Sequence, residues 1–200
     1  MSICSSSYRL FQKEMVMQVV VMKEAGMEEA LYGLSLSFKD RAIPPSEWWT
    51  DERYTKMKRV ADSLAGRGGG HNKFLESIVV WIDIEAPRYW WSEFDTYRAG
   101  ITKQSESTMH TLRKRDLMYS DFAGVTHPYI EDINVCRESM SIQEIKAALP
   151  ESYLQRRLVC TNYKALRNIY HQRLTHKLPE WGIFCKRIKE SLIKPEWVVK

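Results

Sequence analysis

The clearest pattern in the chain is an alternation of apolar and other residues in the segment 78–84, IVVWIDI. Alternate residues fall on one face of an extended backbone, which predicts a half-buried strand that ends at Pro87. The segment 15–22 (MVMQVVVM) is short and rich in β-branched residues, so we predict a second strand there. A third, shorter strand is expected at 36–38. The residues that share the buried face of the clearest strand are Ile78, Val80, Ile82 and Ile84.

Apolar residues spaced three and four apart predict helices elsewhere. Ser141 and Glu144 form a capping box in front of one helix, which Pro150 stops. We expect the last third of the chain to be helical. The predicted helices are 23–34, 52–64, 88–96, the segment before Pro150, 162–174 and 180–192, with a helical turn over 72–77.

The remaining segments are predicted to be mainly loops. Residues 41–51 contain Pro44–Pro45 and are expected to form a loop insertion, whereas 101–115 has no clear pattern and 119–134 is a loop with some helix. Helices that frame a few strands indicate an α+β fold, a mixed sheet flanked by helices, in a single domain over residues 1–200.

Composition narrows the class of protein. Hydrophobic residues make up 44% of the 200, no run of 18 apolar residues occurs, and the N-terminus has no secretory pattern. The four cysteines form no C-x-x-C pair, and the five histidines show no ligand spacing. We therefore expect a cytoplasmic protein with reduced thiols, no membrane segment and no metal site.

Charge is distributed unevenly along the chain. Residues 151–200 carry eleven Lys or Arg and four acids, a net charge of +7 within a total of +5, so the rest of the chain is at −2. An anionic partner and a simple solvated helix face both remain open.

Two further features carry possible chemistry. The run Gly66–Gly70 (GRGGG) lacks the ending of a P-loop, so it is either a flexible turn or a place where the backbone approaches a ligand closely. Asn162 and Arg173 are eleven residues apart and share a helix face. That face either lines a partly polar cavity or ends in an arginine that reaches out from the edge of a core.

Two blocks of sequence resemble the flavin-dependent thymidylate synthases. The first is Gly70-His71-x-x-x-Leu75-Glu76, followed by a strand that ends in Ala86-Pro87. The second is Lys146-x-x-Leu149-Pro150, followed by Asn162-x-Lys164, Leu166, Asn168 and Arg173. Leu36-Ser37-Phe38 is similar to an early Val-Ser-Phe of that family, and the resemblance covers residues 15–192.

The resemblance implies a homotetramer whose active sites lie between subunits. It implies FAD as cofactor, methylenetetrahydrofolate as one-carbon donor, NADPH as reductant, and a pyrimidine deoxynucleotide such as dUMP as substrate. Arg173 would polarise the pyrimidine. The implied substrate-binding residues are Lys146, Arg98, Gln104, Ser105 and Glu93, and the implied cofactor-binding residues are His71, Glu76, Tyr97, Asn162, Lys164, Asn168 and Ser37.

The signature loop departs from the family pattern. Thr96-Tyr97-Arg98 stands where the family has Arg-His-Arg, so one arginine of the three residues remains. Tyr97, Trp90 and Trp91 are candidates for stacking on a ring or for core packing. The retained Arg173, Asn162 and Asn168 favour what the resemblance implies, a methyltransferase that acts on C5 of a pyrimidine deoxynucleotide by methylation or hydroxymethylation, whereas the altered loop favours the alternative. The alternative is a non-catalytic protein that keeps the fold and binds a nucleotide or, less expected, nucleic acid.

Overall fold

The computed structural model describes residues 17–38, 45–48, 50–124 and 129–200. Four strands form one sheet in the order β1-β2-β4-β3. They are β1 (Gln18–Ala25), β2 (Val79–Pro87), β3 (Thr102–Ser105) and β4 (Leu154–Asn162). The predicted α+β fold is confirmed, with the refinement that the strands pair antiparallel.

Strand β2 follows the predicted alternation closely. Val80, Ile82 and Ile84 have no exposed surface, while the residues between them are half-buried. The strand continues past the predicted 84 and ends at Pro87, as expected. A strict alternation of large aliphatic residues is thus sufficient to define this strand and its buried face.

Strand β4 contradicts the prediction that the last third is helical. Its sequence, LQRRLVCTN, has three polar residues near its start, which hide the alternation. Leu154, Val159 and Thr161 are buried, so the strand is held by its neighbours in the sheet rather than by a visible pattern. Tertiary pairing overrides the local signal here.

The start of the chain differs from the prediction in two places. Strand β1 runs on to Ala25, so helix α2 (Met27–Ser35) begins four residues after the predicted start at 23. Between them Gly26 has φ +88°, and a Cβ on it would lie 2.4 Å from the carbonyl oxygen of Ser77. The predicted strand at 36–38 is instead a 3₁₀ turn, η1 (Leu36–Phe38), which continues directly from α2. Residues 15 and 16 of the predicted first strand lie outside the described residues.

Most predicted helices are present with small changes at their ends. The capping box at Ser141 is confirmed, and α10 begins with Pro179 at its first turn. Within the predicted insertion, α3 carries Trp48, which is buried against the ring of Tyr32 at 5.3 Å; residues 41–44 and 49 lie outside the described residues. The structure adds α11, which follows the helix predicted to be the last. The helices are α3 (Pro45–Trp48), α4 (Asp51–Leu64), η2 (Lys73–Ser77), α5 (Arg88–Phe94), α6 (Thr108–Thr111), η3 (Tyr119–Asp121), α7 (Ile130–Cys136), α8 (Ile142–Ala148), α9 (Tyr163–Arg173), α10 (Pro179–Ser191) and α11 (Glu196–Val199).

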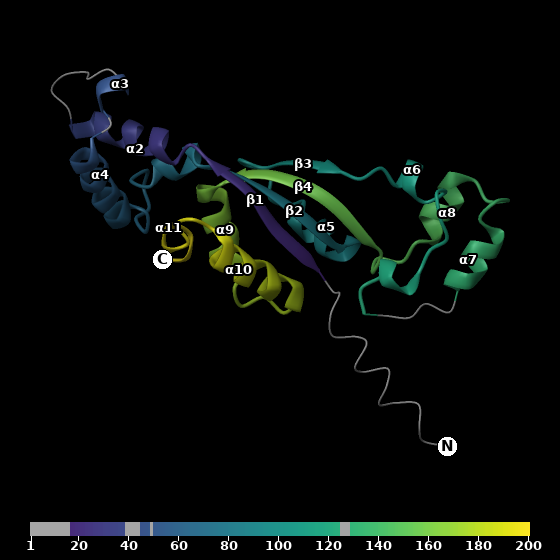
Figure 1. Cartoon of the computed structure of the whole chain (residues 1–200). Helices are drawn as coiled ribbons and strands as arrows, with labels where there is room; N and C mark the ends of the chain where they lie inside the picture. The colour runs from purple at the N-terminus through teal and green to yellow at the C-terminus, as the bar shows by residue number, and fades with distance from the viewer. Residues whose placement is uncertain (1–16, 39–44, 49, 125–128) are drawn as a thin grey trace. The chain divides into compact units, whose positions relative to one another are not determined.

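The chain groups into two compact units. Of the described residues, unit 1 contains those within 17–19, 83–97 and 103–158, and unit 2 contains those within 20–82, 98–102 and 159–200. In unit 2, α9 packs against α10, α11 and η2, while α2 packs against α4 and η2 (Figure 1). The core of unit 1 under α7 and α8 is formed by Leu112, Leu117, Phe122, Ile130, Ile133, Ile145, Leu149 and Tyr153.

The described residues include neither a membrane-spanning helix nor a cluster of metal-ligating side chains. None of the helices described is both long and apolar enough to cross a membrane. In the same part of the chain, no group of three or more His, Cys, Asp or Glu side chains is placed to hold a metal ion.

Candidate functional site

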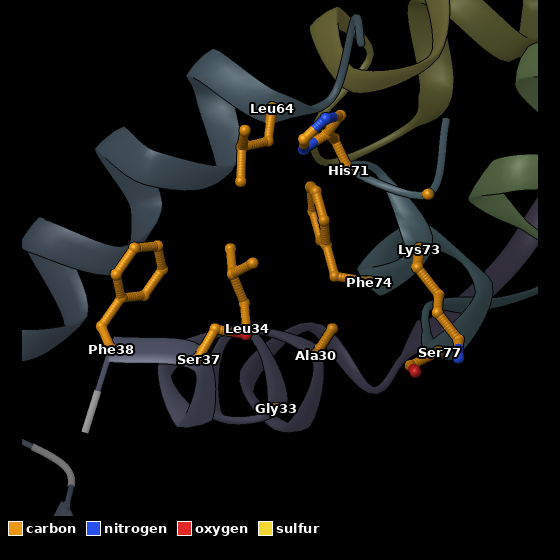
Figure 2. Close-up of a pocket in the computed structure, with 11 residues that line it drawn as sticks. Ala30, Gly33, Leu34, Ser37, Phe38, Leu64, His71, Lys73, Phe74 and Ser77 are labelled. Carbon is orange, nitrogen blue, oxygen red and sulfur yellow. The ribbon is translucent and has the colours of Figure 1, made fainter. Parts of the chain in front are cut away.

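A pocket of about 500 Å³ opens within unit 2, between α2 and η1 on one side and the end of α4, the glycine-rich turn and η2 on the other. Figure 2 shows Leu34 reaching from α2 and Phe74 from η2 into the space between the helices. The volume lies in the range of small-molecule sites. The lining residues are Ala30, Gly33, Leu34, Ser37, Phe38, Leu64, Gly70, His71, Lys73, Phe74 and Ser77.

The pocket combines an apolar surface with a few polar groups. Ser37 and His71, two of the residues expected to bind the cofactor, both line it although they come from different elements. Lys73 adds a cation that sequence reasoning missed, because a lysine in an exposed turn carries no signal of its own. Of the described lining residues, none is acidic. The pocket therefore suits a ligand that is neutral or anionic rather than cationic.

Local backbone geometry brings His71 to the pocket. Gly69 and Gly70 have φ of +66° and +89°, values that a side chain would disfavour, and the chain turns through them into η2. Nothing lies within 4 Å of a Cβ built on Gly70, so the backbone is open at this edge of the pocket. The glycine-rich segment is thus a tight turn that also leaves a ligand room to approach.

Helix α9 holds both ends of this turn. Lys164, another expected cofactor residue, donates a hydrogen bond to Oδ1 of the buried Asn72, whose Nδ2 donates to the carbonyl of Ala65 at 3.2 Å. Arg167 donates to the carbonyl of Gly66 at 3.3 Å. Lys164 does not line the pocket itself, but it binds Asn72, the residue between the lining residues His71 and Lys73.

Asn162 and Asn168 lie on the same helix with different surroundings. Asn162 is the N-cap of α9, and its Oδ1 accepts a hydrogen bond from the backbone N–H of Ala165 at 2.9 Å. A Cβ on Gly100, which has φ +70°, would lie 2.7 Å from Nδ2 of Asn162, so the loop backbone passes close to this amide. Asn168 is exposed, and its Oδ1 accepts from Gln172 at 2.9 Å.

Arg173 occupies the other end of α9. It is half-buried, and its guanidinium carbon lies 4.7 Å from the centroid of the Trp181 ring. Eleven residues separate it from Asn162, which is roughly 16 Å at 1.5 Å per residue. The two side chains therefore do not reach the same ligand atom within one chain. Glu76 and Arg98, also in unit 2, are exposed.

The other predicted substrate and cofactor residues belong to unit 1. Gln104 and Ser105 are exposed on β3, and Lys146 is exposed in the last turn of α8. Glu93 is half-buried on α5, and the Tyr97 ring meets that of Phe94 edge-on at 6.2 Å. Trp90 and Trp91 are buried, so of the two interpretations offered for them, core packing is the one that the structure supports.

Unit 1 also contains an ionic cluster that sequence reasoning missed. Arg157 lies over the Trp91 ring at 4.3 Å and donates to both carboxylate oxygens of Asp95 at 3.1 Å. Lys103 donates to the same carboxylate at 2.6 Å. Burial raises the pKa of Asp95, but the hydrogen bonds from Lys103 and Arg157 outweigh it, so the pKa lies below its usual value. The cluster fastens the end of α5 to β3 and β4.

Two solved structures of one enzyme are similar to this chain along most of its length. A crystal structure of the flavin-dependent thymidylate synthase of Helicobacter pylori with FAD and dUMP matches with a TM-score of 0.74 at 16% identity, over 91% of this chain and 98% of that one. A second structure of that enzyme with the same ligands gives 0.71 at 18% identity, over 89% of this chain and 94% of that one. No family model and no curated protein matches the sequence. The chain therefore has a flavin-dependent thymidylate synthase-like fold.

Proposed function

We propose that this protein transfers a one-carbon unit to C5 of a pyrimidine deoxynucleotide, with FAD as its cofactor. The reaction would be methylation of dUMP, with methylenetetrahydrofolate as the carbon donor and NADPH as the reductant. A variant is hydroxymethylation, in which water adds in place of the hydride and no NADPH is consumed. The observation that carries the proposal is the position of Ser37 and His71. These residues come from separate motifs that resemble the family's, and both line one pocket in a chain with the matching fold.

The pocket residues fit a flavin. Leu34, Leu64 and Phe74 offer an apolar wall for a ring, and Lys73 offers a cation for phosphate. The open backbone at Gly70 leaves room for close approach. Bound FAD would supply hydride chemistry, which amino-acid side chains lack. His71, Ser37 and Glu76 on one side, and Asn162, Lys164 and Asn168 on α9, are the proposed cofactor-binding residues, together with Tyr97.

The chain's own residues would bind and polarise the nucleotide. Arg173 carries a permanent charge and a planar pair of donors, which suits stabilisation of negative charge that develops on a pyrimidine carbonyl. Lys146 and Arg98 would bind the phosphate through charge-assisted hydrogen bonds. Glu93, Gln104 and Ser105 would complete the nucleotide site through hydrogen bonds. No nucleophilic side chain is required in this scheme, because positioning and polarisation lower the barrier.

A homotetramer with dihedral symmetry would complete the site. The roughly 16 Å between the two ends of α9 keeps Asn162 and Arg173 from reaching the same ligand atom within one chain. Neighbouring subunits would bring these two kinds of group together at one site. Sedimentation at micromolar concentration tests this part of the proposal. A tetramer is expected, and a monomer would contradict an active site shared between subunits.

Flavin binding and turnover provide the direct test. Protein purified in the dark should show flavin absorbance or gain it on titration with FAD. It should then release tetrahydrofolate when given dUMP or dCMP, methylenetetrahydrofolate and NADPH. The absence of both flavin binding and turnover would contradict the proposal.

A second candidate function is a nucleotide-binding protein without catalytic activity. The specific observation in its favour is Thr96-Tyr97 in place of two charged residues of the family's pattern. Each missing charge-assisted contact would weaken phosphate binding by about 1.5–3 kcal/mol. Calorimetric binding of dUMP or FAD without turnover on any pyrimidine nucleotide would favour this candidate.

A further inference from the structure

The charge of the unit 2 pocket is set by one side chain. Lys73 lines the pocket, is exposed, and has no side-chain hydrogen bond or ion pair with any other residue that the structure describes. The other titratable side chain in the described wall is that of His71, and none of the described lining residues is acidic. The pocket therefore contains an ammonium group without a counterion among its own walls.

The rest of the wall is apolar or aromatic. Phe38, 64% exposed, stands at the η1 side, while Leu34, Leu64 and Phe74 form the surface between α2 and α4 (Figure 2). An exposed phenylalanine costs solvation free energy unless a ligand covers it. Phe74 is buried and its ring meets that of Trp197 edge-on at 5.4 Å, so Phe38 is the aromatic side chain of this wall with a ring face open to a flat ligand.

Hydrogen bonds hold the backbone of the turn that carries Lys73. Asn72 is buried and has both ends of its side-chain amide engaged, by Lys164 and by the carbonyl of Ala65. The backbone N–H of Lys73 donates to the carbonyl of Gly70 at 3.1 Å. Lys73 thus extends from a fixed backbone, so that binding an anion requires ordering of its side chain alone.

We propose that Lys73 is the specificity-determining residue of this pocket and that it selects a ligand in which an aromatic ring is joined to an anionic group. The anion would meet the Lys73 ammonium while the ring lies against the apolar part of the wall. The identification of this ligand as a flavin or a folate rests on the proposed function. A phosphate of the flavin cofactor and a carboxylate of the folate share this chemistry.

A pair of dyes tests the charge without assuming the ligand. Anilinonaphthalene sulfonate and N-phenyl-1-naphthylamine have the same rings and differ in one sulfonate, and fluorescence reports the binding of both. The wild-type protein should bind the sulfonate about tenfold more tightly. Lys73→Met should abolish this preference and Lys73→Arg should keep it, whereas Lys189→Met at an exposed position of α10 should leave it unchanged. Phe38→Ala should weaken the binding of both dyes to the same extent.

Two results would overturn the inference. One is equal affinity of the wild type for the two dyes, and the other is an equal loss of both in Lys73→Met, which would make Lys73 a packing residue. Circular dichroism of each variant checks that the exposed substitutions leave the fold intact.

Displacement of the sulfonate dye then distinguishes the two anions. Displacement by FMN but not by riboflavin assigns the site to a flavin phosphate, and displacement by folic acid alone assigns it to a folate carboxylate. Lys73-dependent dye binding in a protein that binds neither FMN nor FAD would support this inference and contradict the proposed flavin function. Conversely, an active flavoenzyme in which Lys73→Met changes no ligand affinity would support the proposed function and refute the role of Lys73.

Discussion

The Arg173 guanidinium lies over the ring of Trp181, with 4.7 Å between its carbon and the ring centroid. A cation over an indole face gains about 0.5–1 kcal/mol at a partly exposed site. The contact orients the guanidinium at the end of α9. It also supplies a purely structural reason for an arginine at this position, so the proposed catalytic role needs a test that separates the two.

Arg173→Lys provides that test. The substitution keeps the charge and the contact with Trp181 but loses the planar pair of donors, so stability should change by less than about 1 kcal/mol. If Arg173 polarises the pyrimidine, the rate of methylene transfer should fall by about 100- to 1000-fold. The assay measures transfer to dUMP and dCMP, with FAD and reductant supplied.

Arg187→Lys on the exposed face of α10 is the matched control and should keep the wild-type rate. Should Arg173→Lys retain more than about a third of that rate, well under 1 kcal/mol has been lost and the catalytic assignment is wrong.

Restoring the two missing charged residues of the signature loop should strengthen the binding of FAD or dUMP. Thr96 is exposed, and its hydroxyl donates to the carbonyl of Glu93 at 2.7 Å. The double substitution Thr96→Arg, Tyr97→His should tighten FAD or dUMP binding by about tenfold or more, since each new charge-assisted contact contributes about 1.5–3 kcal/mol. Isothermal titration at two salt concentrations measures it.

The matched control for the repaired loop is Thr55→Arg, which adds the same charge to an exposed position of α4. If it tightens binding as much, the gain reflects net charge rather than a rebuilt phosphate site.

The Asn72 bridge predicts a cost in stability. Asn72→Leu would leave the carbonyl of Ala65 without its donor and Lys164 without its acceptor, so the free energy of unfolding should fall by about 1–3 kcal/mol. Asn72→Asp keeps an acceptor for Lys164 and should lose less. Urea unfolding measures both, and Asn168→Leu at an exposed site should stay within about 0.5 kcal/mol of wild type. An equal loss in Asn168→Leu would show that the bridge contributes nothing specific.

The ion pair between Asp83 and Arg156 predicts an acid dependence. The hydrogen bonds from Arg156 lower the pKa of Asp83 below its ordinary 3.8. A carboxylate with a lowered pKa in the folded state stabilises the protein above the unfolded pKa, and that stabilisation is lost as pH falls through the folded value. Stability measured by urea unfolding should therefore fall more steeply below about pH 4 in the wild type than in Asp83→Asn. Identical pH profiles of the two proteins would contradict the prediction, and Asp132→Asn, an exposed acid on α7, should behave as wild type.

The local pattern of apolar residues was sufficient to predict a strand or a helix wherever that element buries one regular face. Strand β2 and helix α4 are of this kind, because their aliphatic residues recur at the period of the element. Strand β4 is different. Arg156 and Arg157 are polar in sequence, but each is paired with a carboxylate more than sixty residues away, in β2 and at the end of α5. A short stretch of sequence gives no sign of such long-range ion pairs.

The site was predictable only in part for the same reason. His71 and Ser37 were proposed through a resemblance, and the structure brings both to one pocket. The link between Lys164 and Asn72 joins residues 92 positions apart, and no spacing rule predicts it. The role proposed for Lys73 depends on a pocket wall in which none of the described residues is acidic, and only the folded chain brings those residues together.

Gly26 places a limit on how this protein can vary. A single added methyl group there would press on the carbonyl of Ser77, at 2.4 Å, and Ser77 belongs to the pocket wall. In a saturation library, position 26 should therefore be depleted of every amino acid but glycine, whereas Gly68, with nothing within 4 Å, should accept many. Selection for folding alone would then keep glycine at position 26 and so preserve the backbone at Ser77, one residue of the pocket wall, whether or not the pocket binds a ligand.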